Sequence, residues 1–275
     1  MKTSQIQADI QWVLNCPNLL TPEIDSLKIS PIKLADATRF LEEHRNSMLV
    51  GRYFEQLVRA ILEVDPFYEV IEQGLQIHAD GRTVGELDFI VRDHDGKLTH
   101  CETAIKYYLY YPHTNGTGSN FIGPNPADTF ESKTNHLLTH QLPLSKRHYP
   151  TVERRTTFVE GIIFYPANFE AAHQTPAHLA EDHLRGAWLH ARDAMGLIDF
   201  VDDHFCICQK PHWLAPPSDE AMYMDPITSV HSLTAHFRVG NHPLMLSRLR
   251  YSEGLWEEQE RLFIVPDHWP NLISP

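Results

Sequence analysis

Acidic side chains alternate with apolar ones in the segment Gly85–Val91 (GELDFIV). Successive side chains of a β-strand point to opposite faces, so this spacing places Glu86 and Asp88 together on one face. A half-exposed strand without any functional role would show the same alternation. The segment therefore supplies candidate acidic ligands, and their chemistry depends on what lies beside them.

The next apolar segment, residues 98–111, carries Glu102 and Lys106 on one side of a predicted strand. Charges on a largely apolar strand are costly unless they are paired or bound to a cation. Glu55 adds a carboxylate at the edge of the apolar stripe of a predicted helix, where an ordinary boundary residue would also lie. Together Asp88, Glu102 and Glu55 predict an oxygen-ligand site for Mg²⁺ or Mn²⁺, with a lysine to neutralise charge developing on phosphorus.

Hydrophobic periodicity, turn residues and prolines predict the elements that must position these side chains. Helices are expected at residues 6–14, 31–44, 47–64, 127–142 and 177–195, and strands at 68–78, 83–91, 98–111, 157–165 and 205–209. The order from residue 47 is helix, three strands, helix and strand. This order predicts an α/β fold with a mixed sheet, in which residues 1–46 form an N-terminal helical segment, 47–166 the core and 167–275 a C-terminal extension of the same globule.

The segment Gly85–Ile90, followed by a strand with Glu102 and Lys106, resembles the PD-(D/E)XK nucleases. More narrowly, nearly the whole chain resembles the bacterial family catalogued as domain of unknown function 1853. The stretches that carry this resemblance are 12–17 (WVLNCP), 51–55 (GRYFE), 101–109 (CETAIKYYL), 123–142 and 213–216 (WLAP). The resemblance implies a restriction-endonuclease-like α-β-β-β-α-β core with N-terminal helices and a C-terminal α/β extension.

The nuclease motif implies that Asp88 and Glu102 are metal ligands and that Glu55 is the helix carboxylate. The superfamily pattern places a lysine two residues after the acid, where this chain has Ala104. Lys106 lies on the same face, about 13 Å along an ideal strand from Glu102.

A lysine that has migrated to the helix 127–142 is the alternative to Lys106. Lys133 lies on the flank of this helix, where it would also fit an ordinary solvated surface. Gln141 interrupts the apolar stripe of the helix and would fit above a polar site.

The net charge of −13, from 23 basic and 36 acidic residues, excludes a basic surface that wraps nucleic acid. A polyanion would have to bind through a metal ion and a local groove. The chain has 4 cysteines, no long apolar segment and no apolar N-terminal leader, which predicts a cytoplasmic protein without a membrane span.

Two functions of different classes follow. The first is a Mg²⁺- or Mn²⁺-dependent phosphodiesterase, a nuclease that cuts DNA or RNA. The second is a nuclease fold without activity that serves as a binding or scaffold module, with Trp213, Trp256 and Trp269 on a surface for an unknown protein partner.

Two other sets of residues have simpler interpretations. Cys206 and Cys208 alternate along a predicted strand, which favours buried thiols over a zinc site. The tyrosines at 107, 108, 110 and 111 would fit either base stacking or packing.

Overall fold

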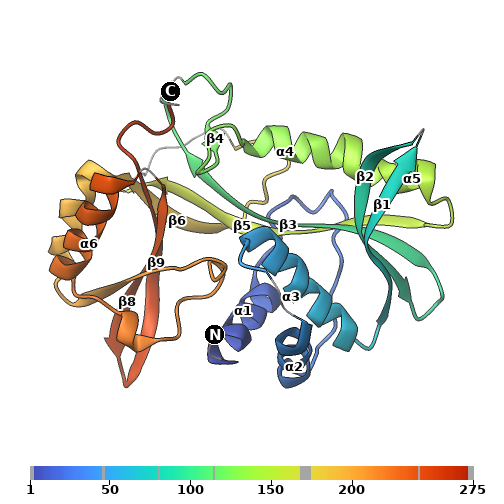
Figure 1. Cartoon of the computed structure of the whole chain (residues 1–275), viewed down its shortest axis with the longest axis horizontal. Coiled ribbons are helices and arrows are strands. Elements are labelled where there is room, and N and C mark those ends of the chain that lie inside the picture. The colour runs from blue at the N-terminus through green and yellow to red at the C-terminus, as the bar shows by residue number, and fades with distance from the viewer. Residues whose placement is uncertain are drawn as a thin grey trace. The chain divides into compact units, whose positions relative to one another are not determined.

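The structure, a computed structural model, describes residues 3–44, 47–79, 81–113, 115–167, 175–240 and 242–271 (Figure 1). The chain forms two compact units that alternate along the sequence. The first unit comprises residues 1–106, 131–161 and 175–183, and the second comprises 107–130, 162–174 and 184–275. The predicted mixed α/β class is confirmed, since the described residues form helices and a nine-stranded mixed sheet.

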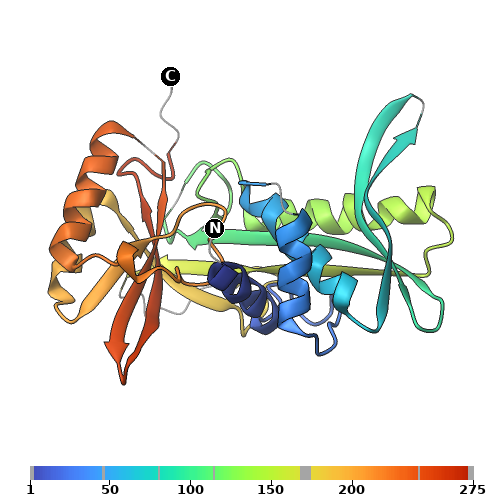
Figure 2. The same ribbon diagram turned by 60° about the horizontal axis from the view of Figure 1, so that its bottom comes forward.

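Three helices open the first unit and pack against one another: α1 (Thr3–Asn15), α2 (Leu34–His44) and α3 (Val50–Val64) (Figure 2). The predicted apolar stripe of α3 is fully buried, and its members are Phe54, Val58, Ile61 and Leu62. A hydrogen bond links α3 to α1, since the Tyr53 hydroxyl donates to Asp9 Oδ2 at 2.9 Å. Apolar burial and this buried hydrogen bond hold α3, and therefore Glu55, in place.

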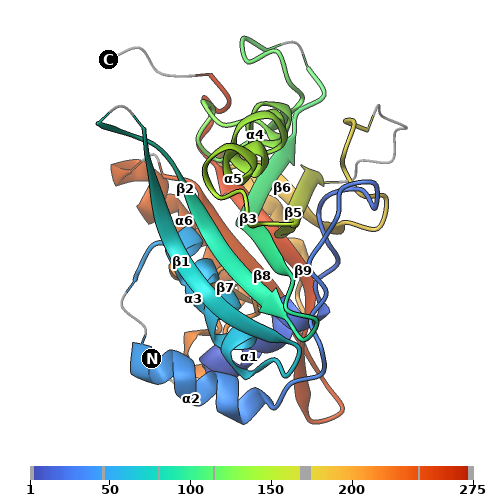
Figure 3. The same ribbon diagram turned by 90° about the vertical axis from the view of Figure 1, so that its right-hand side faces the viewer.

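The strands of the first unit are β1 (Tyr68–Ala79), β2 (Arg82–Asp93) and the first parts of β3 (Leu98–Tyr110) and β5 (Arg154–Pro166). β1 pairs with β2, and β2 pairs with β3, both antiparallel (Figure 3). β5 lies beside β3. Glu153 N–H donates to the Leu98 carbonyl, and Gly161 packs on the Lys106 backbone. From the first contact to the second, the residue number rises along both segments, from 98 to 106 on β3 and from 153, just before β5, to 161 on β5. β5 therefore runs parallel to β3.

A helical run follows in three pieces, α4 (Phe130–His136), the π-helical turn η1 (Leu137–Gln141) and α5 (Leu142–His148). The sequence predicted that this helix ends at Leu142, before Pro143, and the structure shows that it continues. A proline has no N–H and crowds the carbonyl four residues earlier. A wider π-turn before Pro143 relieves that crowding, and such turns are frequent at functional sites.

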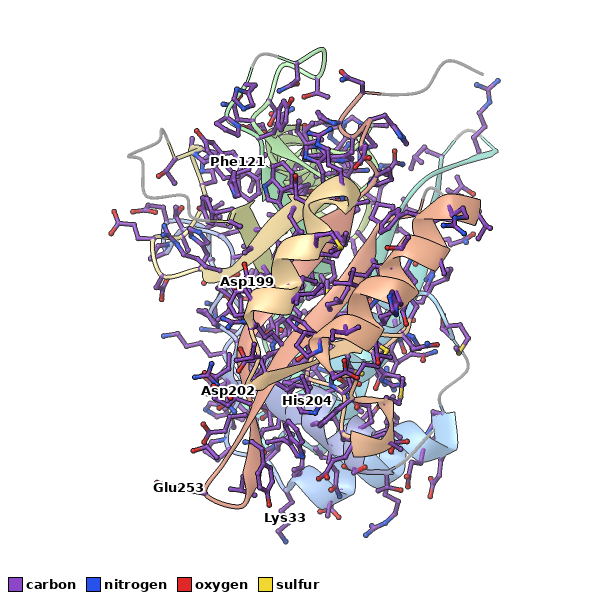
Figure 4. The ribbon with its side chains drawn as sticks, turned by 90° about the vertical axis from the view of Figure 1, so that its left-hand side faces the viewer. Lys33, Phe121, Asp199, Asp202, His204 and Glu253 are labelled. Atoms are coloured by element: carbon purple, nitrogen blue, oxygen red, sulfur yellow. The ribbon has the colours of Figure 1, made fainter. Side chains whose placement is uncertain are left out.

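The second unit contains the ends of β3 and β5 and the rest of the sheet. Its other elements are β4 (Phe121–Ile122), β6 (Leu184–His190), the 3₁₀-helices η2 (Ala191–Asp199) and η3 (Glu220–Met222), β7 (Asp203–Ile207), α6 (Pro226–Val239), β8 (Leu244–Ser252) and β9 (Leu255–Val265). β4 pairs with β3, and the other strands follow the order β5-β6-β9-β8-β7. β8 and β9 form a hairpin that turns at Glu253 and Gly254, both with positive φ (Figure 4).

The helix predicted at residues 177–195 is wrong, because residues 184–190 form β6 and residues 191–199 form a 3₁₀-helix. β6 is parallel to β5 on one side and to β9 on the other. β6 has the sequence LRGAWLH, in which only Ala187 and Trp188 are buried and Arg185 is exposed, so it shows no regular alternation that would identify a strand. Tertiary pairing therefore overrides the helical spacing of its alanines and leucines.

Gly161 generates a prediction for stability. A Cβ at this position would lie 1.9 Å from the Lys106 carbonyl oxygen, which is backbone and has little freedom to move. We expect Gly161→Ala to lower the free energy of unfolding by about 3 kcal/mol or more, measured by urea denaturation. Gly51→Ala is the matched control, since nothing lies within 4 Å of its Cβ. The control should be neutral or stabilising by up to about 1 kcal/mol, and an equal effect of both changes would contradict the close contact.

Candidate functional site

Asp88 and Glu102 lie next to each other on adjacent strands. The register of β2 and β3 pairs Phe89 with Cys101 and Ile90 with His100, so its next step pairs Asp88 with Glu102. The Thr103 backbone N–H donates to Asp88 Oδ2 at 2.8 Å, and the Thr103 hydroxyl donates to the same oxygen at 3.2 Å. One oxygen of Asp88 is thereby fixed by two donors from the neighbouring strand.

Glu102 is 1% exposed, and each of its oxygens accepts a hydrogen bond. His100 Nε2 lies 2.7 Å from Oε1, and Gln141 Nε2 donates to Oε2 at 2.6 Å. These two contacts fix the orientation of a carboxylate that the strand alone would leave buried without partners. The prediction that Gln141 faces a polar site is therefore supported by a direct contact with Glu102.

His100 is a site residue that the sequence analysis missed. Its ring is 0% exposed, and its Nδ1 has no hydrogen-bond partner among the described residues. The available signal was its position two residues before Glu102, which places both side chains on one face of β3.

Gln141 reaches Glu102 from the π-helical turn η1. A π-turn inserts one extra residue per turn, so it rotates the side chains that follow relative to a regular helix. The π-turn that precedes Pro143 therefore sets the direction of the Gln141 side chain, whose amide contacts Glu102.

Glu55 lies at the rim of the buried face of α3, as predicted, with its side chain 28% exposed. Arg52 Nη1 lies 3.1 Å from Glu55 Oε2 and 3.7 Å from Glu86 Oε1. Because the Arg52 side chain is 58% exposed, solvent screens both ion pairs. Arg52 is therefore a cation at the edge of the carboxylates rather than a buried counterion.

Burial and nearby carboxylates raise the pKa of Asp88 and of Glu55. Burial and the nearby charge of Glu102 raise the pKa of Asp88 to about 7, and Glu55 adds to this effect, while the Thr103 hydrogen bonds oppose it. Burial also raises the pKa of Glu55, which Arg52 opposes. Desolvated like charges of this kind are typical of a place where a cation binds.

The two predicted lysines occupy different surroundings. Lys106 is half-buried on β3, four residues beyond Glu102, and its backbone carries the close contact with Gly161. Lys133 is exposed on α4 and forms no ion pair within the described part of the chain. The predicted role of each lysine, to neutralise charge that develops on phosphorus, is not tested by this arrangement and stays a prediction.

The metal ligands predicted here are Asp88, Glu102 and Glu55, an all-oxygen set. Within the described ranges, no three His, Cys, Asp or Glu side chains are already arranged around a common metal position. Mg²⁺ commonly keeps several waters and takes only one or two protein carboxylates. Asp88 and Glu102 are such a pair, because a carboxylate has about four lone-pair positions and each of these uses two.

The remaining sequence interpretations concern the second unit. Cys206 and Cys208 are buried free thiols, as expected for core residues. Trp213 and Trp269 are buried, so they do not form the partner surface proposed for them, whereas Trp256 is half-buried. The tyrosines at 107, 108 and 110 are buried as well, which favours packing over base stacking. Tyr111 is half-buried, and its ring packs against Trp188 and Trp269.

The raised pKa of Asp88 predicts a pH dependence of stability. The folded chain holds this proton up to about pH 7, whereas an ordinary aspartate releases it near 3.8. Stability contributed by the protonated carboxyl is therefore lost as the pH rises from about 4 through 7. We expect Asp88→Asn, which keeps an acceptor for Thr103, to raise the Tm more at about pH 8 than at about pH 5.

Asp95→Asn provides the control for this measurement, because Asp95 is exposed in the turn between β2 and β3 and the change removes the same charge. Its effect on Tm should change little over this pH range, because its pair with His94 is exposed and screened by solvent. A Tm difference between Asp88→Asn and the unchanged protein that is constant with pH would contradict the raised pKa.

Among known proteins, only a family model matches this chain. Neither the curated proteins nor the solved structures contain a match to this chain. In the described residues, no helix has the length and apolar character needed to cross a membrane. The family described as domain of unknown function DUF1853 matches residues 8–265, which is nearly the full length. The chain is therefore a member of the DUF1853 family.

Proposed function

We propose that this protein is a phosphodiesterase that depends on Mg²⁺ or Mn²⁺ and cuts DNA or RNA, with a restriction-endonuclease-like PD-(D/E)XK core. The observation that carries the proposal is the pair Asp88 and Glu102, which lie side by side on adjacent strands and are largely removed from solvent. Glu55 adds a third carboxylate from α3. The elements α3, β1, β2, β3, α4 and β5 follow one another in this order, with β4 before α4 and with η1 and α5 after it, and this order supports the same core.

Each neighbouring side chain has a definite part in this proposal. Thr103 holds Asp88, while His100 and Gln141 hold Glu102, so the ligand oxygens are oriented before an ion binds. The bound ion would lower the pKa of a water that attacks phosphorus. Glu55 would complete the shell, through water or after release from Arg52.

Positive charge near the scissile phosphate is the second requirement of the reaction. Lys106 or Lys133 is the predicted source, and the structure adds Arg52, which contacts Glu55 and Glu86 at the rim. Arg52 is also exposed enough to meet a phosphate in a local groove. Comparing Ala variants at these three positions would identify the cation that the reaction uses.

A silent binding module is the second candidate, and one observation favours it. Ala104 stands at the usual place of the lysine, while both oxygens of Glu102 are already held by His100 and Gln141. In this case the polar cluster would be a structural remnant. The protein would then bind nucleic acid or a protein partner without cutting a bond.

The test is an assay of metal-dependent cleavage on labelled single- and double-stranded DNA and RNA, with Mg²⁺, Mn²⁺ or EDTA. We expect cleavage that EDTA abolishes and that Asp88→Asn lowers by at least about 100-fold, because the substitution removes a ligand charge. Asp95→Asn serves again as the control with the same charge change and should retain full activity.

Ion binding provides a second readout that does not need the right substrate. Mg²⁺ at about 100 times its Kd should stabilise the unchanged protein by roughly 2.7 kcal/mol and leave Asp88→Asn unaffected. Stabilisation without cleavage would favour the silent module. Equal cleavage by the unchanged protein and Asp88→Asn would refute the assignment.

A further inference from the structure

A second polar site lies in the first unit, on residues that the proposed reaction does not use. It is a pocket of about 190 Å³ at the end of α1 and beside β5. Its apolar wall includes Val13, Leu27 and Phe158, and its polar groups include Cys16, Asn18 and Glu160. This volume is well above that needed for a single water, so the pocket suits a compact ligand.

Glu160 is the unexplained group in this pocket. It is 3% exposed, and its Oε2 is buried without a hydrogen-bond partner among the described residues. A buried polar atom without a partner costs about 1–3 kcal/mol, and such atoms are few in native proteins. Burial raises the pKa of Glu160 well above the ordinary value, since no described base balances its charge.

Cys16 is half-buried and lines the same pocket as Glu160. Its thiol donates to the Pro17 carbonyl at 3.4 Å. Burial and the nearby Glu160 raise the pKa of Cys16. The thiol is therefore a poor nucleophile and serves better as a soft acceptor than as a reactive group.

The lining of the pocket is rich in acceptors and has no base. Among the ten residues that line it, the two that titrate are both acids, Cys16 and Glu160. Asn18 Oδ1 accepts a bond of 3.4 Å from the Leu20 N–H, and Ser26 adds a hydroxyl. An occupant that donates several hydrogen bonds and carries positive charge would satisfy these groups together.

We propose that this pocket binds a small organic cation, a primary ammonium group on a short apolar chain, with the ammonium paired to Glu160. The three N–H donors of an ammonium match Glu160, Cys16 and Asn18. Val13, Leu27 and Phe158 cover the apolar chain. Pairing with the ammonium favours the charged form of Glu160, so binding lowers its raised pKa.

This site is independent of the proposed nuclease reaction. None of the predicted metal ligands lines the pocket, and none of the pocket residues contacts Asp88 or Glu102 through a hydrogen bond in the described chain. A failure of either proposal therefore leaves the other in place.

The experiment is a titration of the full chain with propylammonium, with 1-propanol as a neutral probe of the same size. NMR shifts and isothermal titration calorimetry would measure binding. We expect a Kd for propylammonium in the millimolar range, because a ligand of four heavy atoms gains only a few kcal/mol. Glu160→Gln should weaken this binding by at least about 10-fold, since the ion pair is lost, and should leave the weak effect of propanol unchanged.

Glu153→Gln is the matched control, because Glu153 is exposed just before β5 and the change removes the same charge. It should bind propylammonium as the unchanged protein does. Equal binding by Glu160→Gln and the unchanged protein would overturn the proposal, as would equal binding of propylammonium and propanol.

Proton release gives a second test that needs only the unchanged protein, in case Glu160→Gln fails to fold. Calorimetry in two buffers with different ionisation enthalpies, repeated from about pH 5 to 8, should show proton release on propylammonium binding within this range, because the pKa of free Glu160 is raised. Propanol should release none. The absence of proton release with propylammonium at every pH would also overturn the pairing with Glu160.

Discussion

The hydrogen bonds to Glu102 are the constraint on which the architecture of the site depends. A carboxylate that is 1% exposed on a central strand is costly unless both oxygens have partners. His100 is supplied by the same strand, whereas Gln141 comes from a helical segment 39 residues further along the chain. The helical run must therefore approach β3 closely and at a set rotation. The π-turn before Pro143 is the local feature that allows this rotation without ending the helix.

The same constraint explains why Asp88 and Glu102 have different surroundings although they are neighbours. Glu102 is held by side chains that carry no negative charge, while Asp88 depends on Thr103 and lies against Glu102 itself. Burial and repulsion therefore act together on Asp88 and raise its pKa to about 7. A cation would relieve both effects at once. A chain with a net charge of −13 could thus bind a polyanion only where a bound cation offsets the negative charge of the nearby carboxylates.

The sequence predicted the parts of the site that depend on local periodicity. The stripe of α3, the faces that Asp88 and Glu102 occupy on their own strands and the inward position of Gln141 all follow from the repeats of a helix or a strand. The helix predicted at residues 177–195 failed because pairing of β6 on both sides is a long-range effect. His100 escaped notice because a buried histidine beside an acid differs from an ordinary core residue only through its contacts. The continuation of the helix through Pro143 likewise depends on a backbone irregularity that residue types do not specify.

Glu160 presents the same pattern as Glu102, an acid within an apolar strand, yet the chain treats the two differently. Glu102 has a donor at each oxygen, and Glu160 has no described donor at Oε2. A structural acid in a core would gain partners or be replaced by an apolar residue of similar size, since that exchange is often neutral or stabilising. Gly161 packs on the backbone of Lys106, which fixes β5 against β3 at this point. The Oε2 atom of Glu160, which has no partner among the described residues, is therefore the group that the proposed ammonium ligand would satisfy.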